Sequence, residues 1–361
     1  MRSDLINIVI VDDSPLFRKF LLHIMETVQG INVSGTASNG LEAINVIQKH
    51  KPHVVLMDIN MPGMDGFEAT SQIMNLIPTP VIIISGEYTS DEVAKTFRAL
   101  EVGAVDILPK PPGINSPDHQ KEVEKLINHI RLMSEIKVVR RNPFNKKPPG
   151  ITPKNTTGPG NLSIPPLLKN HPDVIGIGAS AGGPMAIQKL LKGLSGDFLI
   201  PIVIVQHIEP VFAEGFAQWL GLTTGKKVLL AIHDMELKPG MIVLPPGDVH
   251  MGFQNTSILE IVKSPSDRGL RLSIQHLFTS IAHTYGPNSI GIILTGMGTD
   301  GVQGLKLMKE KGAVTIAQDT ISSMIHGMPG EAIKTGAATY KFSIEQMINY
   351  LNEINHQRTI L

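Results

Sequence analysis

A glycine-rich turn around Ser180 is the stretch of the sequence best suited to nucleophilic chemistry. Residues 178–182 read G-x-S-x-G, a spacing in which small neighbours let a sharp strand-to-helix turn expose a serine hydroxyl. The glycines at 176, 178 and 182 also fit a looser pattern that cradles a pyrophosphate at a helix N-terminus. The turn alone therefore leaves three interpretations open, which are a nucleophile, a dinucleotide-binding loop and a purely structural turn.

Two partners for a nucleophilic serine follow later apolar runs of the chain. His207 comes after residues 202–205, and Asp300 comes after residues 289–295. A serine hydroxyl needs a neighbouring base, and an imidazole needs a carboxylate to fix its tautomer. The order Ser–His–Asp differs from that of α/β-hydrolases, although geometry rather than order defines a triad. A dinucleotide site would favour an acidic residue after the second strand, where Gln206 and His207 stand, so this pattern disfavours the cofactor interpretation.

Polar residues also follow the apolar runs of the N-terminal part. Asp12 and Asp13 follow the first run, Asp58 the third, Ser85 the fourth and Lys110 the fifth. Because the carboxyl ends of parallel strands meet at one edge of a sheet, we expect these side chains to converge. Three carboxylates suit Mg²⁺, a hard cation that keeps open positions for phosphate and water. The hydroxyl and the ammonium would then contact phosphoryl oxygens.

These residues require two sheets whose strands alternate with helices. The N-terminal part predicts five β/α units, and the C-terminal part resumes the alternation after a proline- and glycine-rich stretch. We predict an α/β protein with two doubly wound, mainly parallel sheets. The predicted strands of the first part are 6–11, 31–36, 53–57, 80–84 and 104–108. In the second part a short strand begins at Val174 and ends in the glycine-rich turn, and further strands are predicted at 202–205, 227–232, 240–244, 249–251, 257–262, 289–295 and 313–317.

Length and composition limit the class of protein. A chain of 361 residues suits two domains, and 42% hydrophobic with 18% charged residues predicts a globular fold. We predict domains at 1–140 and 171–361 joined by a linker at 141–170. The formal net charge of zero gives no case for nucleic-acid binding. The absence of cysteine excludes thiol chemistry and fits a reducing cytoplasm. No apolar run reaches the ~20 residues of a membrane span, so no membrane insertion is expected.

The N-terminal part resembles a response-regulator receiver domain, which is a flavodoxin-like fold. The resemblance covers residues 5–130 through the motifs VDDS (11–14), DINMPGMDG (58–66), IIIS (82–85) and GAVDILPKP (103–111). It implies that Asp58 accepts a phosphoryl group from a histidine kinase and that Asp12 and Asp13 hold Mg²⁺ with it. It also implies that Ser85 and Lys110 contact the phosphoryl oxygens. Many receivers carry an aromatic switch residue where this chain has Ile107.

The C-terminal part resembles the catalytic domain of the chemotaxis methylesterase family CheB, a Rossmann-like three-layer α/β/α fold. The motifs are GIGASAGGP (176–184), VIVQHI (203–208), LPPGDVHM (244–251), GIILTGMGTDG (291–301) and HGMPGEA (326–332). The resemblance implies a triad of Ser180, His207 and Asp300, with backbone N–H groups near Ala181 and Met297 as the oxyanion site. Many relatives have threonine at Ala181 and lysine at Thr299.

The two resemblances together imply a phosphorylation-activated esterase that demethylates glutamate methyl esters on chemoreceptors and releases methanol. They further imply deamidation of receptor glutamines, Mg²⁺ in the receiver, no cofactor in the esterase domain and a monomer. The receiver is expected to exclude the receptor from the esterase until Asp58 is phosphorylated. The glycines around Ser180 are expected to leave room for that large substrate. The alternative is an inert two-domain adaptor that only binds receptors.

Overall fold

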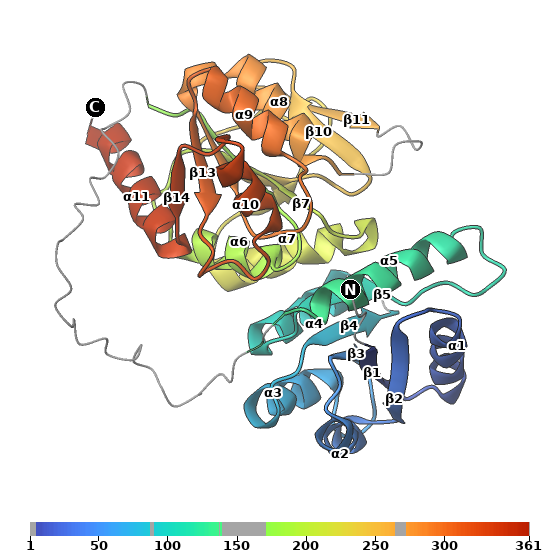
Figure 1. The fold of residues 1–361 in the computed structure, drawn as a ribbon. Helices are drawn as coiled ribbons and strands as arrows, with labels where there is room; N and C mark the ends of the chain where they lie inside the picture. The colour runs from blue at the N-terminus through green and yellow to red at the C-terminus, as the bar shows by residue number, and fades with distance from the viewer. Residues whose placement is uncertain (1–4, 87–89, 137, 139–170, 264–271, 361) are drawn as a thin grey trace, which may run out of the picture. The chain divides into compact units, whose positions relative to one another are not determined.

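The computed structural model describes residues 5–86, 90–136, 138, 171–263 and 272–360. The chain forms two compact units, each built on its own sheet (Figure 1). The linker predicted at 141–170 lies outside the described residues. The predicted domain limits therefore stay a prediction.

The first unit contains a five-stranded parallel sheet in the order β2-β1-β3-β4-β5. This order confirms the predicted doubly wound sheet. The inner strands β3 and β4 are buried throughout and β1 is buried over its last four residues, as expected where helices cover both faces. The strands are β1 (Ile6–Val11), β2 (Ile31–Ala37), β3 (Val54–Asp58), β4 (Val81–Ser85) and β5 (Asp106–Pro109).

The helices of this unit lie on opposite faces of the sheet. Phe20 on α1 contacts His119 on α5, whereas α2 packs beside α3, which is the arrangement that right-handed crossovers produce. Asn39 and Asp65 cap the N-termini of α2 and α3 by accepting the N–H groups of Glu42 and Glu68. The helices between residues 5 and 136 are α1 (Pro15–Glu26), α2 (Gly40–His50), α3 (Gly66–Leu76), α4 (Ser90–Val102) and α5 (His119–Met133).

The second unit contains a seven-stranded parallel sheet in the order β14-β13-β12-β6-β7-β9-β8. Its central strand β6 lies between β12 and β7. The chain builds one half of the sheet and then returns to the other side of β6, so the topological switch point lies between β6 and β12. The strands are β6 (Val174–Ala179), β7 (Ile202–Gln206), β8 (Val228–Leu230), β9 (Ile242–Leu244), β12 (Ser289–Ile293), β13 (Val314–Gln318) and β14 (Tyr340–Phe342).

Two groups of helices cover this second sheet. Helices α6, α7 and α11 pack together, and α8, α9 and α10 pack together, on the two faces seen in Figure 1. This is the predicted three-layer arrangement. The helices are α6 (Gly183–Gly193), η1 (Pro210–Phe212), α7 (Ala213–Thr224), α8 (Ile274–Thr284), η2 (Gly286–Asn288), α9 (Val302–Glu310), α10 (Gly327–Lys334) and α11 (Ile344–Ile360).

The glycines of β6 make room for a helix. A Cβ on Gly176 would lie 2.5 Å from Ile281 Cδ1, and one on Gly178 would lie 2.2 Å from Ile274 Cγ2. Both isoleucines belong to α8. The expectation that these glycines admit a large substrate is therefore wrong for Gly176 and Gly178, because side chains of α8 fill the space.

Four elements differ from the predicted pattern. Strands β10 (Val249–Phe253) and β11 (Leu259–Lys263) pair antiparallel in a sheet of their own. Helix α10 and strand β14 were not predicted. The sequence GMPGEAIK of α10 contains two glycines and a proline, which disfavour helix in isolation, and β14 has only three residues.

Candidate functional sites

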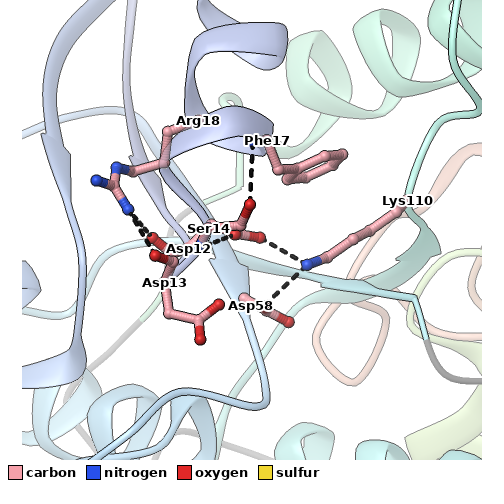
Figure 2. A network of polar contacts seen from close by, with 7 residues as sticks. All are labelled: Asp12, Asp13, Ser14, Phe17, Arg18, Asp58 and Lys110. Atoms are coloured by element: carbon pink, nitrogen blue, oxygen red, sulfur yellow. Dashed lines mark hydrogen bonds and ion pairs between the residues drawn. The ribbon is translucent and has the colours of Figure 1, made fainter.

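Three of the predicted phosphorylation-site residues meet at the carboxyl edge of the first sheet. Lys110 Nζ lies 2.7 Å from Asp12 Oδ2 and 2.9 Å from Asp58 Oδ2 (Figure 2). Asp12 directly follows β1 and Asp58 ends β3, and these are the neighbouring strands at the switch point of this sheet. Asp12 and Asp58 are both buried. The ammonium therefore bridges two carboxylates that water barely reaches.

The electrostatics of this cluster favour protons on its members. Burial raises the pKa of Asp58 to about 6, although its bond to Lys110 opposes the rise. Burial lowers the pKa of Lys110, but its bonds to Asp12 and Asp58 outweigh this effect and raise that pKa overall. Lys110 is thus fully charged at neutral pH.

The carboxylates are spaced for a hard cation. One oxygen each from Asp12, Asp13 and Asp58 lies within 4.8 Å of the other two. Two of these groups are buried and Asp13 is exposed, so the cluster opens to solvent on one side. An oxygen-only donor set with an open side fits Mg²⁺. Ser85 is buried at the end of β4, and its carbonyl accepts the N–H of Lys110 at 2.8 Å.

Two residues on the first turn of α1 support this site and were not predicted. The Arg18 guanidinium donates to the carbonyl of Asp12 at 2.6 Å and to that of Asp13 at 3.1 Å. The Phe17 ring lies over Lys110, with its centroid 4.6 Å from Nζ. Figure 2 shows Phe17 and Arg18 reaching opposite sides of the acidic loop. Ile107, where many receivers carry an aromatic residue, is buried in β5.

In the second unit, Ser180 and His207 follow neighbouring strands. The register pairs Ala179 of β6 with Gln206 of β7, and the N–H of His207 donates to the carbonyl of Ala179 at 2.9 Å. The N–H of Ser180 donates to the carbonyl of Thr295, after β12, at 3.0 Å. Ser180 therefore stands at the switch point between β6 and β12.

His207 is paired with the predicted carboxylate. Its Nε2 lies 2.9 Å from Asp300 Oδ2, and both side chains are mostly buried. Asp300 also accepts the backbone N–H groups of Ile274 and Gln275, at 2.8 and 3.1 Å, and the Ser273 hydroxyl at 3.3 Å. Burial raises the pKa of Asp300, but the bonds from His207 and from the first turn of α8 outweigh it and hold that pKa below its usual value. The carboxylate stays ionised and fixed.

The predicted contact between Ser180 and His207 is not formed as it would be in an assembled triad. Among the described residues, Ser180 Oγ makes no hydrogen bond to His207, whose bonded ring nitrogen Nε2 faces Asp300. Nδ1 is then the nitrogen left to accept a proton from the serine. Contacts of this kind are often loose in the free enzyme and tighten when substrate binds.

The predicted oxyanion residues lie close to Ser180 in sequence and in space. Ala181 follows it before α6, and a Cβ on Gly296 would lie 2.6 Å from Ser180 Cβ. The segment leading to Met297 is therefore in contact with the serine. The Met297 side chain is half exposed. Gly182, with φ of +76°, permits the left-handed turn that begins α6.

Other polar residues beside the pair were not assigned a role from sequence. His250 on β10 and His276 on α8 stack with ring centroids 5.1 Å apart. Burial lowers the pKa of His250, against the opposing field of Asp300. Gln206 is buried and its Nε2 donates to two backbone carbonyls, of Ser180 and His207. In the sequence, Gln206 indicated only that the acidic residue of a dinucleotide-binding site is missing.

Within the parts of the chain that the structure describes, no helix combines the length and apolarity needed to cross a bilayer.

Comparison with known proteins places both units. Residues 8–117 match the response regulator receiver domain, and residues 175–351 match the CheB methylesterase family. The chain is 41% identical over 351 residues to a protein-glutamate methylesterase/protein-glutamine glutaminase of Geobacter metallireducens, covering 97% of this chain and 99% of that protein. It is 40% identical over 355 residues to the protein of the same name from Nitrosospira multiformis, covering 98% of each.

A crystal structure of the CheB methylesterase catalytic domain of Thermotoga maritima is also similar. It is 33% identical and aligns with a TM-score of 0.48, covering 51% of this chain and 98% of that one. The full-length similarity to curated relatives shows the family. The chain belongs to the CheB methylesterases that carry a receiver domain.

Proposed function

We propose that this protein is a phosphorylation-activated protein-glutamate methylesterase and protein-glutamine glutaminase that acts on chemoreceptors in chemotactic adaptation. The observation that carries the proposal is the His207–Asp300 pair beside Ser180 at adjoining strand ends, in a chain of this family. The inert adaptor is disfavoured, because a binding module has no need of a buried carboxylate that orients a histidine. A cytoplasmic location follows from this substrate.

The esterase chemistry uses three side chains. His207 Nδ1 takes the proton of Ser180 Oγ as the oxygen attacks the ester carbonyl, while Asp300 holds Nε2–H. Backbone N–H groups at Ala181 and Met297 stabilise the oxyanion, each worth ~3 kcal/mol. The protonated His207 then gives its proton to the leaving methoxide, and methanol departs.

The acyl-enzyme is cleared by the same groups. His207 removes a proton from water, the hydroxide attacks the acyl carbon, and Ser180 leaves with the proton. The product is the free glutamate carboxylate. Deamidation follows the same course with ammonia as the leaving group, so one site serves both reactions.

The receiver supplies control. A phosphohistidine of a histidine kinase is the phosphodonor. Asp58 Oδ attacks the phosphorus as the P–N bond breaks and the kinase histidine leaves, and Lys110 with Ser85 contacts the phosphoryl oxygens. The carboxylates of Asp12, Asp13 and Asp58 would hold Mg²⁺, which neutralises phosphoryl charge when bound. We propose that the unphosphorylated receiver inhibits the esterase, in a protein that acts as a monomer.

The serine assignment is tested by Ser180→Ala. This substitution should abolish methanol release from methylated receptor membranes and labelling by a fluorophosphonate probe, while phosphorylation of Asp58 by acetyl phosphate continues. Ser195→Ala is a matched control, because Ser195 follows the other end of α6, and it should keep full activity. Turnover near that of the unsubstituted protein in Ser180→Ala would sink the assignment.

A further inference from the structure

We infer that Gln206 is a positioning residue that ties the nucleophile to the base, an inference that rests on the proposed esterase function. The side chain is 3% exposed at the end of β7. Its Nε2 donates to the carbonyl of Ser180 and to that of His207, both at 2.8 Å. One amide group thus spans the two residues whose separation governs proton transfer.

The orientation of this amide is determined by its neighbours. Both partners of Nε2 are carbonyl oxygens, which only accept, so the NH₂ group must face them. Oε1 then points the other way, where it is buried and has no hydrogen-bond partner among the described residues. A Cβ on Gly183 would lie 1.9 Å from Oε1. Gly183 therefore supplies the space that the unpartnered oxygen occupies.

The amide continues the link between two strands beyond their last backbone contact. The β6–β7 register ends at Ala179 and Gln206, with one further bond from the N–H of His207 to the carbonyl of Ala179. Past this point the backbones of Ser180 and His207 separate into different loops. Since Ser180 Oγ makes no bond to His207 among the described residues, the Gln206 amide holds the two loops in register.

Replacing the donor should reduce turnover with little effect on substrate affinity. A misplacement of about 1 Å at a reacting group can cost about 100-fold in rate. We expect Gln206→Glu, which turns a carboxylate toward two carbonyl oxygens, to lower kcat about 100-fold at pH 8. Gln206→Met, which fills the space without a donor or charge, should lower kcat about tenfold. KM for methylated receptor membranes should change less than about threefold in both.

The pH profile separates hydrogen bonding from packing. A buried carboxyl that faces acceptors has a raised pKa, and its protonated form can donate to one carbonyl. The ratio of Gln206→Glu activity to unsubstituted activity should therefore rise as the pH falls from 8 to 6. A residue that only fills space predicts a ratio independent of pH.

One further variant acts on the same amide, and two others serve as controls. Gly183→Ala should displace Gln206 and lower kcat, whereas Gly196→Ala, where an added Cβ meets nothing within 4 Å, should not. Asn355→Leu removes another buried amide, which binds the N–H of Leu199 near the amino end of β7. It should lower stability without lowering kcat of the folded protein.

The full chain with acetyl phosphate and Mg²⁺ is used for every assay, with circular dichroism to confirm folding. Loss of kcat in Gln206→Glu and Gln206→Met at unchanged KM, with the pH-dependent ratio, supports the inference. Full activity of both, or a constant ratio, overturns it. If Ser180→Ala also remains active, the proposed function fails as well; if only Ser180→Ala is inactive, the positioning inference alone fails.

Discussion

At the scale of single residues, the charge of the proposed phosphorylation site depends on both burial and ion pairing. Asp58 lies in a protein interior that disfavours its charge, and one ammonium, Lys110, serves both it and Asp12. The Phe17 ring covers that ammonium. The free receiver therefore holds two buried carboxylates with one ammonium between them. A bound cation or a phosphoryl group can change this balance of charge.

A pH dependence of stability follows from Asp58. Its pKa of about 6 in the folded protein exceeds the ordinary aspartate pKa of 3.8, so the folded state binds the proton more tightly. The stabilising effect of that proton is full below pH ~4 and is lost as the pH rises through about 6. Without Mg²⁺, Asp58→Asn should stabilise the receiver relative to the parent by on the order of 2 kcal/mol at pH 7.

The measurement is thermal unfolding in EDTA at pH 4 and pH 7. The midpoint temperature of receiver unfolding should be several degrees higher in Asp58→Asn than in the parent at pH 7. At pH 4 the difference should be much smaller. An equal difference at both pH values would contradict the role of the buried charge.

The sequence predicted most of the polar side chains that the structure brings together, but not the side chains that support them. The carboxyl ends of parallel strands meet at one edge of a sheet, and this topological rule alone predicted that Asp12, Asp58 and Lys110 lie together. The same rule predicted that His207 lies near Asp300. Phe17, Gln206 and the stacked His250 and His276 depend on side-chain directions across elements distant in the sequence. The order of residue types along the chain does not show in which direction each of these side chains points.

At the scale of elements, the N-terminus of α8 anchors the carboxylate of Asp300. Two backbone N–H groups and the Ser273 hydroxyl surround Asp300, and the partial positive charge of the helix end favours the anion. Ser273 also caps the helix by accepting the N–H of His276 at 3.2 Å. The helix is therefore a part of the site, although it contributes no group to the bond-making steps.

Ser273→Ala tests how much of this support comes from the hydroxyl. Loss of an N-cap should destabilise the second unit by about 1 kcal/mol. Because Asp300 keeps the N–H groups of Ile274 and Gln275, kcat should fall less than about tenfold, as for other indirect contacts. Thermal unfolding and methanol release measure the two effects.

The matched control is an N-cap substitution in the first unit. Asn39→Ala removes the N-cap of α2 and should give a similar stability loss without altering the esterase. If Ser273→Ala is as inactive as Asp300→Ala, the backbone N–H groups do not hold the carboxylate.

The elements themselves were largely predictable because their signals are local. Long apolar runs predicted β1, β3, β4, β6, β7 and β12 with little displacement. The shortest elements, and the separate pairing of β10 with β11, arise from contacts made elsewhere in the fold, so their own residues carry weak signals. The order of strands across the second sheet likewise depends on non-local pairing.

At the scale of the whole molecule, two doubly wound sheets each place their chemistry at a switch point. The first collects carboxylates and a lysine there, and the second collects Ser180, His207 and Asp300. Both sites therefore use the one edge of a parallel sheet where loops can diverge to admit a ligand. The linkage between the two sites is the property that phosphorylation exploits in our proposal.

Removing the receiver tests that linkage. A chain truncated to residues 171–361 should release methanol at least as fast as the phosphorylated full chain and should ignore acetyl phosphate. The full chain should gain activity with acetyl phosphate and Mg²⁺, and Asp58→Asn should not. A truncated protein no faster than the unphosphorylated full chain would show that the receiver does not inhibit.

The glycines of β6 have a consequence for how damage to this enzyme would be recognised. Gly176 and Gly178 let α8 lie against the central strand, and the same helix holds Asp300 at its first turn. A single added methyl group would lift the helix and carry the carboxylate away from His207, with every reactive group still present. Surveys of variants that score only the chemically active side chains would pass such a change as harmless. The geometry of this active site therefore also depends on glycines, which contribute by having no side chain.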